Sequence, residues 1–195
     1  EDYTNWYNFK HGSSDYLKKF TYGLTELNRS EIKKSKLVAC PGCYPTATLL
    51  GLYPLLKENL IDCMNITVDA KSGVTGAGRS PKRDLLFSEI SESLRPYSAT
   101  GHRHIPEIEQ QISKITQKES RINFVPHLVP MNRGELITSH LKIEEQIGYE
   151  DIIEIYIKIY KDEKFISILE DRVLPNTINV RGSNSCHISI IPGRI

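Results

Sequence analysis

The hydrophobic positions before residue 72 predict two strands and leave the start of the chain irregular. Residues 37–39 form a short apolar run that ends at Cys-Pro-Gly, which is typical of a buried strand stopped by a turn. Residues 66–70 alternate apolar and polar side chains, as a half-buried strand does, and lead into a glycine-rich loop. Residues 1–36 are aromatic and polar without a long periodic face, so we expect turns and short segments there.

Three segments repeat apolar residues at helical spacing. The first follows Cys43, and Pro54 within it predicts a kink or the start of a new turn. The second opens at Pro106 and carries isoleucines on one face. Residues 152–160 fit both a strand and a helix, and their length and their Glu and Lys content favour a helix.

The remaining apolar segments predict strands. Residues 122–129 and 135–143 form two of them, which the turn around Asn132 would join as a hairpin. The tail returns to strand-like alternation at 178–180 and 188–190. Interleaved helices and hairpins predict an α+β fold, with a mixed, largely antiparallel sheet and helices on one face.

The composition is that of an ordinary folded protein, and it argues against a disordered, nucleic-acid-binding or membrane protein. The 195 residues are 39% hydrophobic and 25% charged with a formal net charge of +1, so we expect a folded domain without a field that favours nucleic acid or an anionic membrane. No apolar run approaches the roughly 20 residues of a membrane span, and the first residues lack a signal-peptide core. We therefore expect a cytoplasmic protein whose four cysteines are reduced thiols.

Cys43 lies at the predicted junction between a strand and a helix. Unpaired N–H groups and the positive end of the helix dipole would lower the pKa of the thiol there and could hold an oxyanion. A small buried cysteine is the plain structural alternative. The spacing of Cys40 and Cys43 also occurs in dithiol redox proteins and in half of a zinc site, but Cys63 and Cys186 supply no second pair. We predict no metal site.

Two polar clusters could serve a cysteine nucleophile. His102, Arg103 and His104 precede the second helix, where an imidazole could exchange a proton with the thiol, although these residues could equally cap the helix. The loop from Ser72 to Arg79 has three glycines and a basic end, like a phosphate-cradling loop, and a plain flexible loop fits it about as well.

His127 stands alone on a predicted strand. We interpret it as a structural histidine whose polar atoms are satisfied within the fold.

Four ordered segments carry a resemblance to a known family. They are Pro-Gly-Cys-Tyr-Pro-Thr at 41–46, Ser-Gly-Val-Thr-Gly-Ala-Gly-Arg at 72–79, His-Arg-His-Ile-Pro-Glu at 102–107 and Pro-His-Leu-Val-Pro-Met at 126–131. Together they closely resemble the N-acetyl-gamma-glutamyl-phosphate reductase family, whose members are acyl-phosphate reductases of arginine biosynthesis. Residues 22–29 and 181–184 look similar too, so the resemblance covers nearly the whole chain.

The resemblance implies a reaction and a role for each segment. The Cys43 thiolate would attack the acyl phosphate, phosphate would leave, and NADPH would reduce the thioester to N-acetylglutamate 5-semialdehyde. His102 would act as the acid/base. The other implied roles are substrate binding by Arg79, His104 and Glu107, and cofactor binding by Ser72, Gly73 and Asn184. A homo-oligomer is implied as well, with a fold similar to the C-terminal catalytic domain of glyceraldehyde-3-phosphate dehydrogenase-like reductases.

Departures from the family bear on the domain organisation. No strand followed by a G-x-x-G-x-x-G turn precedes Cys43, so NADP would be held mainly by a domain absent from this chain. Residues 1–38 would be a remnant of that dinucleotide-binding domain, and residues 39–195 a catalytic and dimerisation domain that stops before its C-terminal end. Cys40 replaces a more usual polar residue and could form an adventitious disulfide with Cys43 under oxidation.

Two other functions stay open at this point. A related acyl-phosphate reductase of the aspartate-semialdehyde dehydrogenase type shares the thioester chemistry and would prefer another acyl phosphate. A non-catalytic module that keeps the fold for oligomer contacts or for binding a metabolite would lack an activated thiol at Cys43.

Overall fold

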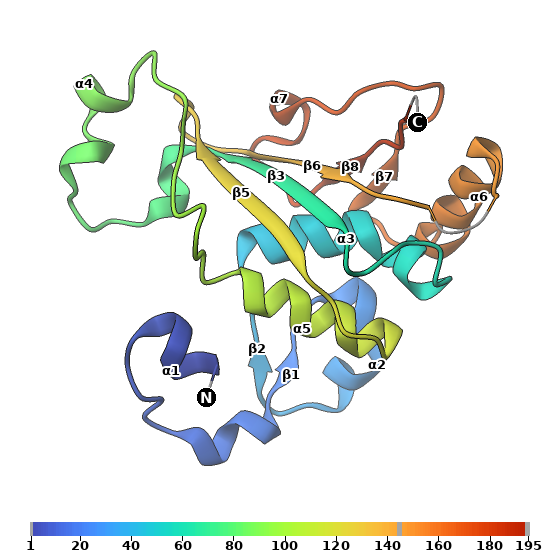
Figure 1. The fold of residues 1–195 in the computed structure, drawn as a ribbon, viewed down its shortest axis with the longest axis horizontal. Helices are drawn as coiled ribbons and strands as arrows, with labels where there is room; N and C mark the ends of the chain where they lie inside the picture. Colours follow the sequence, from blue (N-terminus) through green and yellow to red (C-terminus); the bar gives the residue numbers. More distant parts are fainter. Residues whose placement is uncertain (1, 144–145, 194–195) are drawn as a thin grey trace.

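A four-stranded mixed sheet forms the upper layer of the fold in the computed structural model, which describes residues 2–143 and 146–193 (Figure 1). Its strand order is β4-β5-β3-β6. The strands are β3 (Ile66–Ser72), β4 (Arg95–Pro96), β5 (Ile122–Leu128) and β6 (Glu135–His140). β3 runs parallel to β5 and antiparallel to β6, while β4 is antiparallel to β5. The predicted mixed sheet is confirmed.

The predicted hairpin between the last two of these strands is wrong, because β3 lies between β5 and β6. The segment after β5 crosses the end of β3 before it returns as β6. Backbone hydrogen bonds fix this crossing, since the N–H groups of Gly73 and Val74 donate to the carbonyls of Gly134 and Met131 at 3.0 and 2.9 Å. The turn around Asn132 is therefore hydrogen-bonded to the residues that follow β3, and it does not connect two neighbouring strands.

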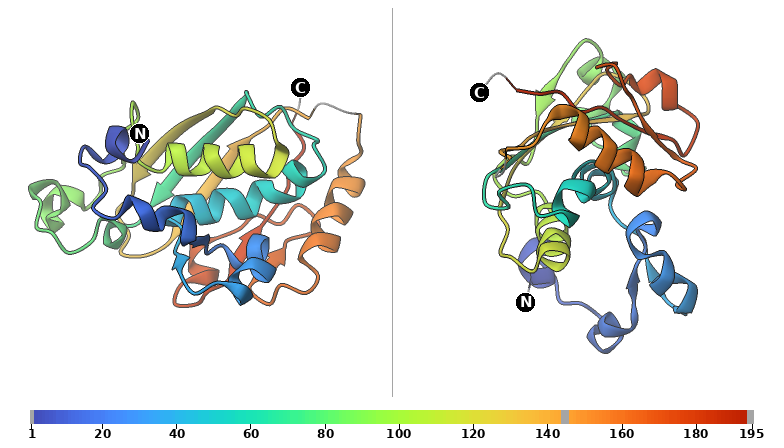
Figure 2. Two further views of the ribbon diagram at one scale, coloured as in Figure 1. Left: turned by 90° about the horizontal axis from the view of Figure 1, so that it is seen from below. Right: turned by 90° about the vertical axis from the view of Figure 1, so that its right-hand side faces the viewer.

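Two helices cover one face of the sheet, as predicted (Figure 2). They are α3 (Cys43–Lys57) and α5 (Ile105–Thr116), and they pack against each other. Leucines of α3, isoleucines of α5 and the inward side chains of β3 form the core, which includes the fully buried Leu49, Leu52, Leu56, Ile66, Val68, Ile108 and Ile112. The apolar positions of α5 recur every three or four residues, which explains why this face is buried.

α3 continues through Pro54 as one helix. Proline has no N–H, so the carbonyl of Leu50 loses its usual partner four residues on. The hydroxyl of Tyr160 donates to that carbonyl at 2.6 Å, and the hydroxyl of Tyr156 donates to the neighbouring Gly51 carbonyl at 2.6 Å. Both tyrosines lie on α6 (Tyr149–Tyr160), which confirms the helix predicted for residues 152–160.

The N-terminal elements lie on the side of α3 and α5 that faces away from the sheet (Figures 1 and 2). They are α1 (Asp2–Tyr7), the 3-10 helix η1 (Ser14–Lys19), β1 (Thr21–Tyr22), α2 (Thr25–Lys34) and β2 (Val38–Ala39). α2 is longer than the short segments expected there. β2 pairs in parallel with β1 but is exposed, so the burial predicted for it is wrong. The assignment of residues 1–38 to a dinucleotide-binding domain stays a prediction.

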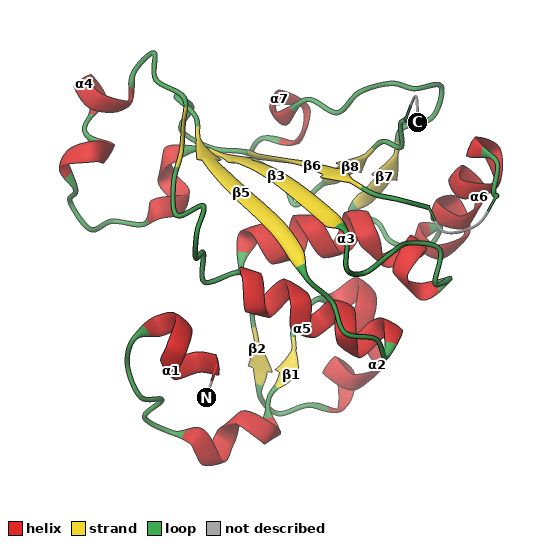
Figure 3. Cartoon of the chain, in the orientation of Figure 1, coloured by secondary structure: helices red, strands yellow, loops and turns green. Residues whose placement is uncertain are grey.

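The C-terminal elements form a small parallel pair of strands beside β6 (Figure 3). They are β7 (Ile166–Ile168) and β8 (Cys186–Ile188), separated by α7 (Thr177–Val180). The strand predicted at 178–180 is wrong, because the Asn176 side chain caps a helical turn by accepting the N–H of Ile178 at 3.2 Å. The strand predicted at 188–190 is shifted, since β8 ends at residue 188.

The short elements η2 (Val74–Ala77), η3 (Arg83–Leu85) and α4 (Phe87–Ile90) lie in the connection between β3 and β4. Within residues 2–143 and 146–193, none of the helices has both the length and the apolar character that crossing a membrane requires.

Candidate active site

Cys43 is the first residue of α3 and follows β2 by way of Pro41 and Gly42. This confirms the predicted strand-to-helix junction. Gly42 is the N-cap residue of α3, with extended backbone angles of −65° and 160°. The thiol therefore stands at the end of the helix where backbone N–H groups are unpaired.

The start of α5 lies directly against Gly42. A β-carbon at position 42 would lie 2.5 Å from Nε2 of His104, so only glycine leaves room for the imidazole. Three residues on, Oε1 of Glu107 accepts the N–H of Gly42 at 2.9 Å. The same oxygen accepts the Tyr22 hydroxyl, also at 2.9 Å. The first turn of α5 thus contacts Gly42, the residue before Cys43, through the His104 ring and through the Glu107 carboxyl group.

His102 supports His104 from behind. Its Nδ1 accepts the backbone N–H of His104 at 3.2 Å, and its ring packs edge-on against Tyr44 and Tyr97. Burial lowers the pKa of both imidazoles to about 4, and the charge of the nearby Arg103 contributes. Both rings are therefore neutral at pH 7, and His104 is the one that touches the turn carrying Cys43.

Glu135, the first residue of β6, lies close to Cys43. The two residues share a cavity of about 290 Å³ with Ser72 and Gly73. Partial burial, and then the charge and hydrogen bonding of Glu135, raise the pKa of the Cys43 thiol to about 12, and these effects outweigh the N–H groups of the helix start. The predicted lowering of the thiol pKa is therefore wrong.

Glu135 is itself perturbed. Burial raises the pKa of its carboxyl group to about 7, and the nearby Cys43 thiol partly offsets this rise. Its Oε1 is buried and has no hydrogen-bond partner. Cys43 and Glu135 are thus a neighbouring acid pair in which the carboxyl group gives up its proton first.

Most N–H groups of the glycine-rich loop are already hydrogen-bonded within the fold, unlike those of a phosphate-cradling loop. The N–H groups of residues 73–76 and of Gly78 all donate to backbone carbonyls. Gly73 is needed for close packing, since a β-carbon there would lie 2.8 Å from the Met131 carbonyl oxygen. Ser72 and Gly73 line the small cavity, whereas Arg79 is exposed and lines neither that cavity nor the larger one described next.

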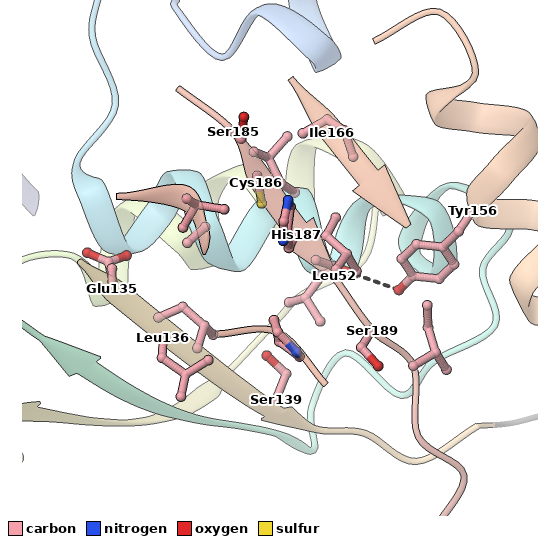
Figure 4. Close-up of a pocket in the computed structure, with 18 of the residues that line it drawn as sticks. Leu52, Glu135, Leu136, Ser139, Tyr156, Ile166, Ser185, Cys186, His187 and Ser189 are labelled. Atoms are coloured by element: carbon pink, nitrogen blue, oxygen red, sulfur yellow. Dashed lines mark hydrogen bonds between the residues drawn. The ribbon is translucent and has the colours of Figure 1, made fainter. Parts of the chain in front are cut away.

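A larger cavity of about 1080 Å³ extends from Cys43 along α3 and β6 to β8 (Figure 4). Asn184 lines it, and its predicted role in binding the cofactor stays a prediction. Arg133 and Arg181 line it as well, as does Glu135. The sequence prediction missed these three residues. Arg133 and Glu135 directly follow the segment at 126–131 that carried part of the family resemblance, so their position in the chain was the available signal.

His127 lies away from these cavities, on the sheet face that α3 and α5 leave uncovered. Its Nδ1 is 3.0 Å from Oδ1 of Asp69 on the neighbouring strand. Lys71 contacts the same carboxyl group at 2.9 Å. His127 is thus tied to the sheet, but its Nδ1 is buried without a hydrogen-bond partner, so the prediction that its polar atoms are satisfied is not confirmed.

All four cysteines lie within the described residues and are free thiols, with Cys40 and Cys43 exposed. In that part of the chain, no group of three or more His, Cys, Asp or Glu side chains could hold a metal ion.

Comparison with known proteins gives a consistent set of relatives. Residues 43–193 match the family described as semialdehyde dehydrogenase, dimerisation domain. An N-acetyl-gamma-glutamyl-phosphate reductase from Lachnoclostridium phytofermentans is 49% identical over 97% of this chain and 55% of its own length. A probable chloroplastic enzyme of the same name from Arabidopsis thaliana is 48% identical over 100% of this chain and 48% of its own length. The chain spans about half the length of these relatives.

Solved structures agree on the fold. Aspartate semialdehyde dehydrogenase from Francisella tularensis aligns with a TM-score of 0.65 at 16% identity, over 88% of this chain and 61% of that one. Aspartate semialdehyde dehydrogenase II from Vibrio cholerae aligns with a TM-score of 0.64 at 16% identity, over 86% and 56%. At this identity the likeness concerns the fold alone.

Proposed function

Because the chain belongs to the semialdehyde dehydrogenase dimerisation domain family, we propose that it is the catalytic part of an N-acetyl-gamma-glutamyl-phosphate reductase with Cys43 as its nucleophile. The observation that carries this proposal is the site at the start of α3. There the thiol stands at a helix N-terminus, next to the Gly42 that packs against His104, and it shares a small cavity with Glu135. The identity of 46–49% to reductases of this name supports the proposed substrate class.

The reaction begins when the Cys43 sulfur attacks the acyl carbon and phosphate leaves, which forms a thioester. The helix start supplies N–H groups for the negative oxygen that develops on the acyl carbon. Because the resting thiol is protonated, a neighbouring group must take its proton during attack. Glu135, whose carboxyl pKa is raised by burial to about 7, shares the small cavity with the thiol and would take that proton.

The histidines act at the other side of the turn. His102 was predicted as the acid/base, and that role stays a prediction. The contact between His104 and Gly42 favours His104 as the imidazole that exchanges a proton with the reacting groups, while His102 orients it by accepting its backbone N–H. Replacing each histidine by Gln in turn separates the two roles, since the residue that exchanges the proton should show the larger loss of kcat.

NADPH would enter the small cavity beside the thiol with its nicotinamide end only. A space of about 290 Å³ is smaller than most pockets that enclose a whole drug-sized ligand, so Ser72 and Gly73 would border the nicotinamide. When bound, NADPH would supply the hydride that converts the thioester to the aldehyde. Aspartate semialdehyde dehydrogenase from Candida albicans, which aligns with this chain with a TM-score of 0.52 at 14% identity, was solved with NADP. Asn184 would approach the cofactor or substrate from the larger cavity.

Substrate anions would meet the cationic groups of the larger cavity. Arg133 and Arg181 line it together with Cys43, and an arginine can bind a carboxylate or a phosphate through two parallel hydrogen bonds. The prediction that Arg79 and His104 bind substrate is kept as a proposal. Arg79 would reach a substrate only from outside the two cavities.

We propose that two copies meet through the uncovered face of the sheet, where Asp69, Lys71 and His127 lie. The family description as a dimerisation domain supports oligomerisation. A charge reversal at Asp69 should then lower the apparent mass in size-exclusion chromatography with light scattering. A cytoplasmic location also stays a proposal, and the Arabidopsis relative is named chloroplastic.

The test uses the full-length protein that contains this chain. It should consume NADPH with N-acetyl-gamma-glutamyl phosphate much faster than with aspartyl phosphate, and Cys43→Ala should abolish turnover. Cys63→Ala is the matched control, because Cys63 is buried away from the site. A reductase that keeps its activity without Cys43 would contradict the proposal, and a preference for aspartyl phosphate would assign the chain to the aspartate-semialdehyde dehydrogenase type.

A further inference from the structure

We infer that Glu107 is a positioning residue that holds the Gly42–Cys43 turn in place through hydrogen bonds, and that it does not contact substrate. This inference rests on the proposed function, since it takes Cys43 as the nucleophile. Oε1 of Glu107 accepts the N–H of Gly42 and the hydroxyl of Tyr22, each at 2.9 Å. These donors come from points 65 and 85 residues away along the chain.

The carboxyl group of Glu107 is well placed for this task. It belongs to the first turn of α5, three residues after the N-cap His104, where the helix dipole favours a negative side chain. The same turn carries the imidazole that packs against Gly42. Gly42 is therefore held in two ways, by a hydrogen bond to its N–H and by the ring that occupies the space of a β-carbon.

The bond that Glu107 makes sets the start of α3. Gly42 is the N-cap residue, and its carbonyl accepts the first bonds of the helix, from the N–H of Thr46 at 3.0 Å and from its hydroxyl at 2.8 Å. Holding the N–H of Gly42 thus fixes the peptide unit from which the helix and the Cys43 side chain project. A shift of about 1 Å at such a position is enough to lower a rate by two orders of magnitude.

Charge argues against a substrate contact. The proposed substrate carries one carboxylate and a phosphate, and the acidic side chain of Glu107 offers neither of these anions an attractive partner. In addition, Glu107 lines neither the small nor the large cavity that contains Cys43. Glu107 therefore serves the site as a hydrogen-bond acceptor at a fixed distance from the N–H of Gly42. Its negative charge matters less than this distance.

Two conservative substitutions of Glu107 distinguish its role as a hydrogen-bond acceptor from the effect of its charge. Glu107→Gln keeps an oxygen at the same reach and removes the charge. Glu107→Asp keeps the charge and shortens the side chain by about 1.5 Å, the length of one C–C bond, which takes the oxygen out of hydrogen-bonding range of Gly42. In the full-length reductase, kcat and KM would be measured for both variants. Hydrogen–deuterium exchange of the peptide that contains Gly42 would be followed by mass spectrometry.

Positioning predicts that Glu107→Gln keeps kcat within about threefold of the wild type, while Glu107→Asp loses about tenfold or more in kcat with little change in KM. Exchange at Gly42 should increase in the Asp variant and not in the Gln variant, with the 122–128 peptide of β5 unchanged in both. The opposite order, with Asp active and Gln impaired, or a change confined to KM, would overturn the inference. If the wild type itself shows no reductase activity, the proposed function fails instead, and the exchange data still decide whether Glu107 holds the turn.

Discussion

His104 packs its imidazole onto the α-carbon of Gly42, in the space that a β-carbon would occupy in any other residue. The contact joins the first turn of α5 to the N-cap of α3, so the two helices that cover the sheet meet at the nucleophile. Because His104 is buried, its ring cannot swing away freely.

Gly42→Ala should therefore disrupt the site more than its size suggests. The new methyl group would lie 2.5 Å from Nε2 of His104 and 2.9 Å from two ring carbons. We expect a loss of about 1–3 kcal/mol in the free energy of unfolding, the usual cost of overpacking, together with at least a tenfold loss of kcat. Gly51→Ala is the stability control, because nothing lies within 4 Å of its β-carbon position and it should stabilise α3 by about 0.5–1 kcal/mol. Urea titrations of both variants would check this, and equal stabilities would contradict it.

Glu135→Gln should lower the pKa of the Cys43 thiol. The negative charge and hydrogen bonding of Glu135 help to raise that pKa to about 12, and a neutral amide removes the charge. Alkylation of Cys43 by iodoacetamide at pH 8 should become about 3- to 10-fold faster, which corresponds to about half to one pKa unit. Glu26→Gln is the matched control on the larger cavity and should leave the rate unchanged. A slower reaction in Glu135→Gln would show that the carboxylate promotes ionisation of the thiol.

The same substitution should change how stability depends on pH. Burial raises the carboxyl pKa of Glu135 from its ordinary value of 4.5 to about 7 in the folded protein. The folded state therefore binds this proton more tightly than the unfolded state does, so the stability that it contributes is present below pH 4.5 and is lost as the pH rises through 7. Between pH 5 and pH 8 the wild type should lose more stability than Glu135→Gln in chemical denaturation. Parallel pH profiles would contradict this assignment.

Tyr160→Phe tests how α3 tolerates Pro54. The variant leaves the Leu50 carbonyl without a partner inside the core, so we expect a loss of about 1–3 kcal/mol. In a Pro54→Ala background the restored N–H should satisfy that carbonyl, and the loss caused by Tyr160→Phe should shrink. Tyr156→Phe should lose less, because the Gly51 carbonyl keeps its helical partner. If Tyr160→Phe lost the same free energy of unfolding in the wild-type and in the Pro54→Ala background, the Tyr160 hydroxyl would not be compensating for the proline.

Local periodicity predicted the elements that the structure confirms most clearly. β3, α5 and α6 each show one buried face, and a pattern of that kind depends only on neighbours in sequence. The pairing of strands depends on contacts between residues that are far apart in the sequence. β5 and β6 are close in sequence but both pair with β3, since the segment around Asn132 bonds to Gly73 and its neighbours.

The site was predictable to the extent that its residues have a characteristic local setting. Cys43 follows Pro-Gly and precedes an apolar helix, and the histidines precede a proline that opens another. Glu135 has no such setting, because only the folded chain buries its carboxyl group beside the thiol. Partial burial first, and then that neighbour, raise the pKa of the thiol, which explains why the helix dipole alone predicted its direction wrongly.

The raised pKa of Cys43 has a consequence for the resting protein in the presence of oxidants. Peroxides attack the thiolate form of cysteine and lead to sulfenic and then irreversible sulfinic and sulfonic acids. A thiol that is kept protonated by its surroundings reacts slowly along this path, even though Cys43 is exposed. We therefore expect the sulfur to resist peroxide between turnovers, and we expect Glu135→Gln to make it more sensitive.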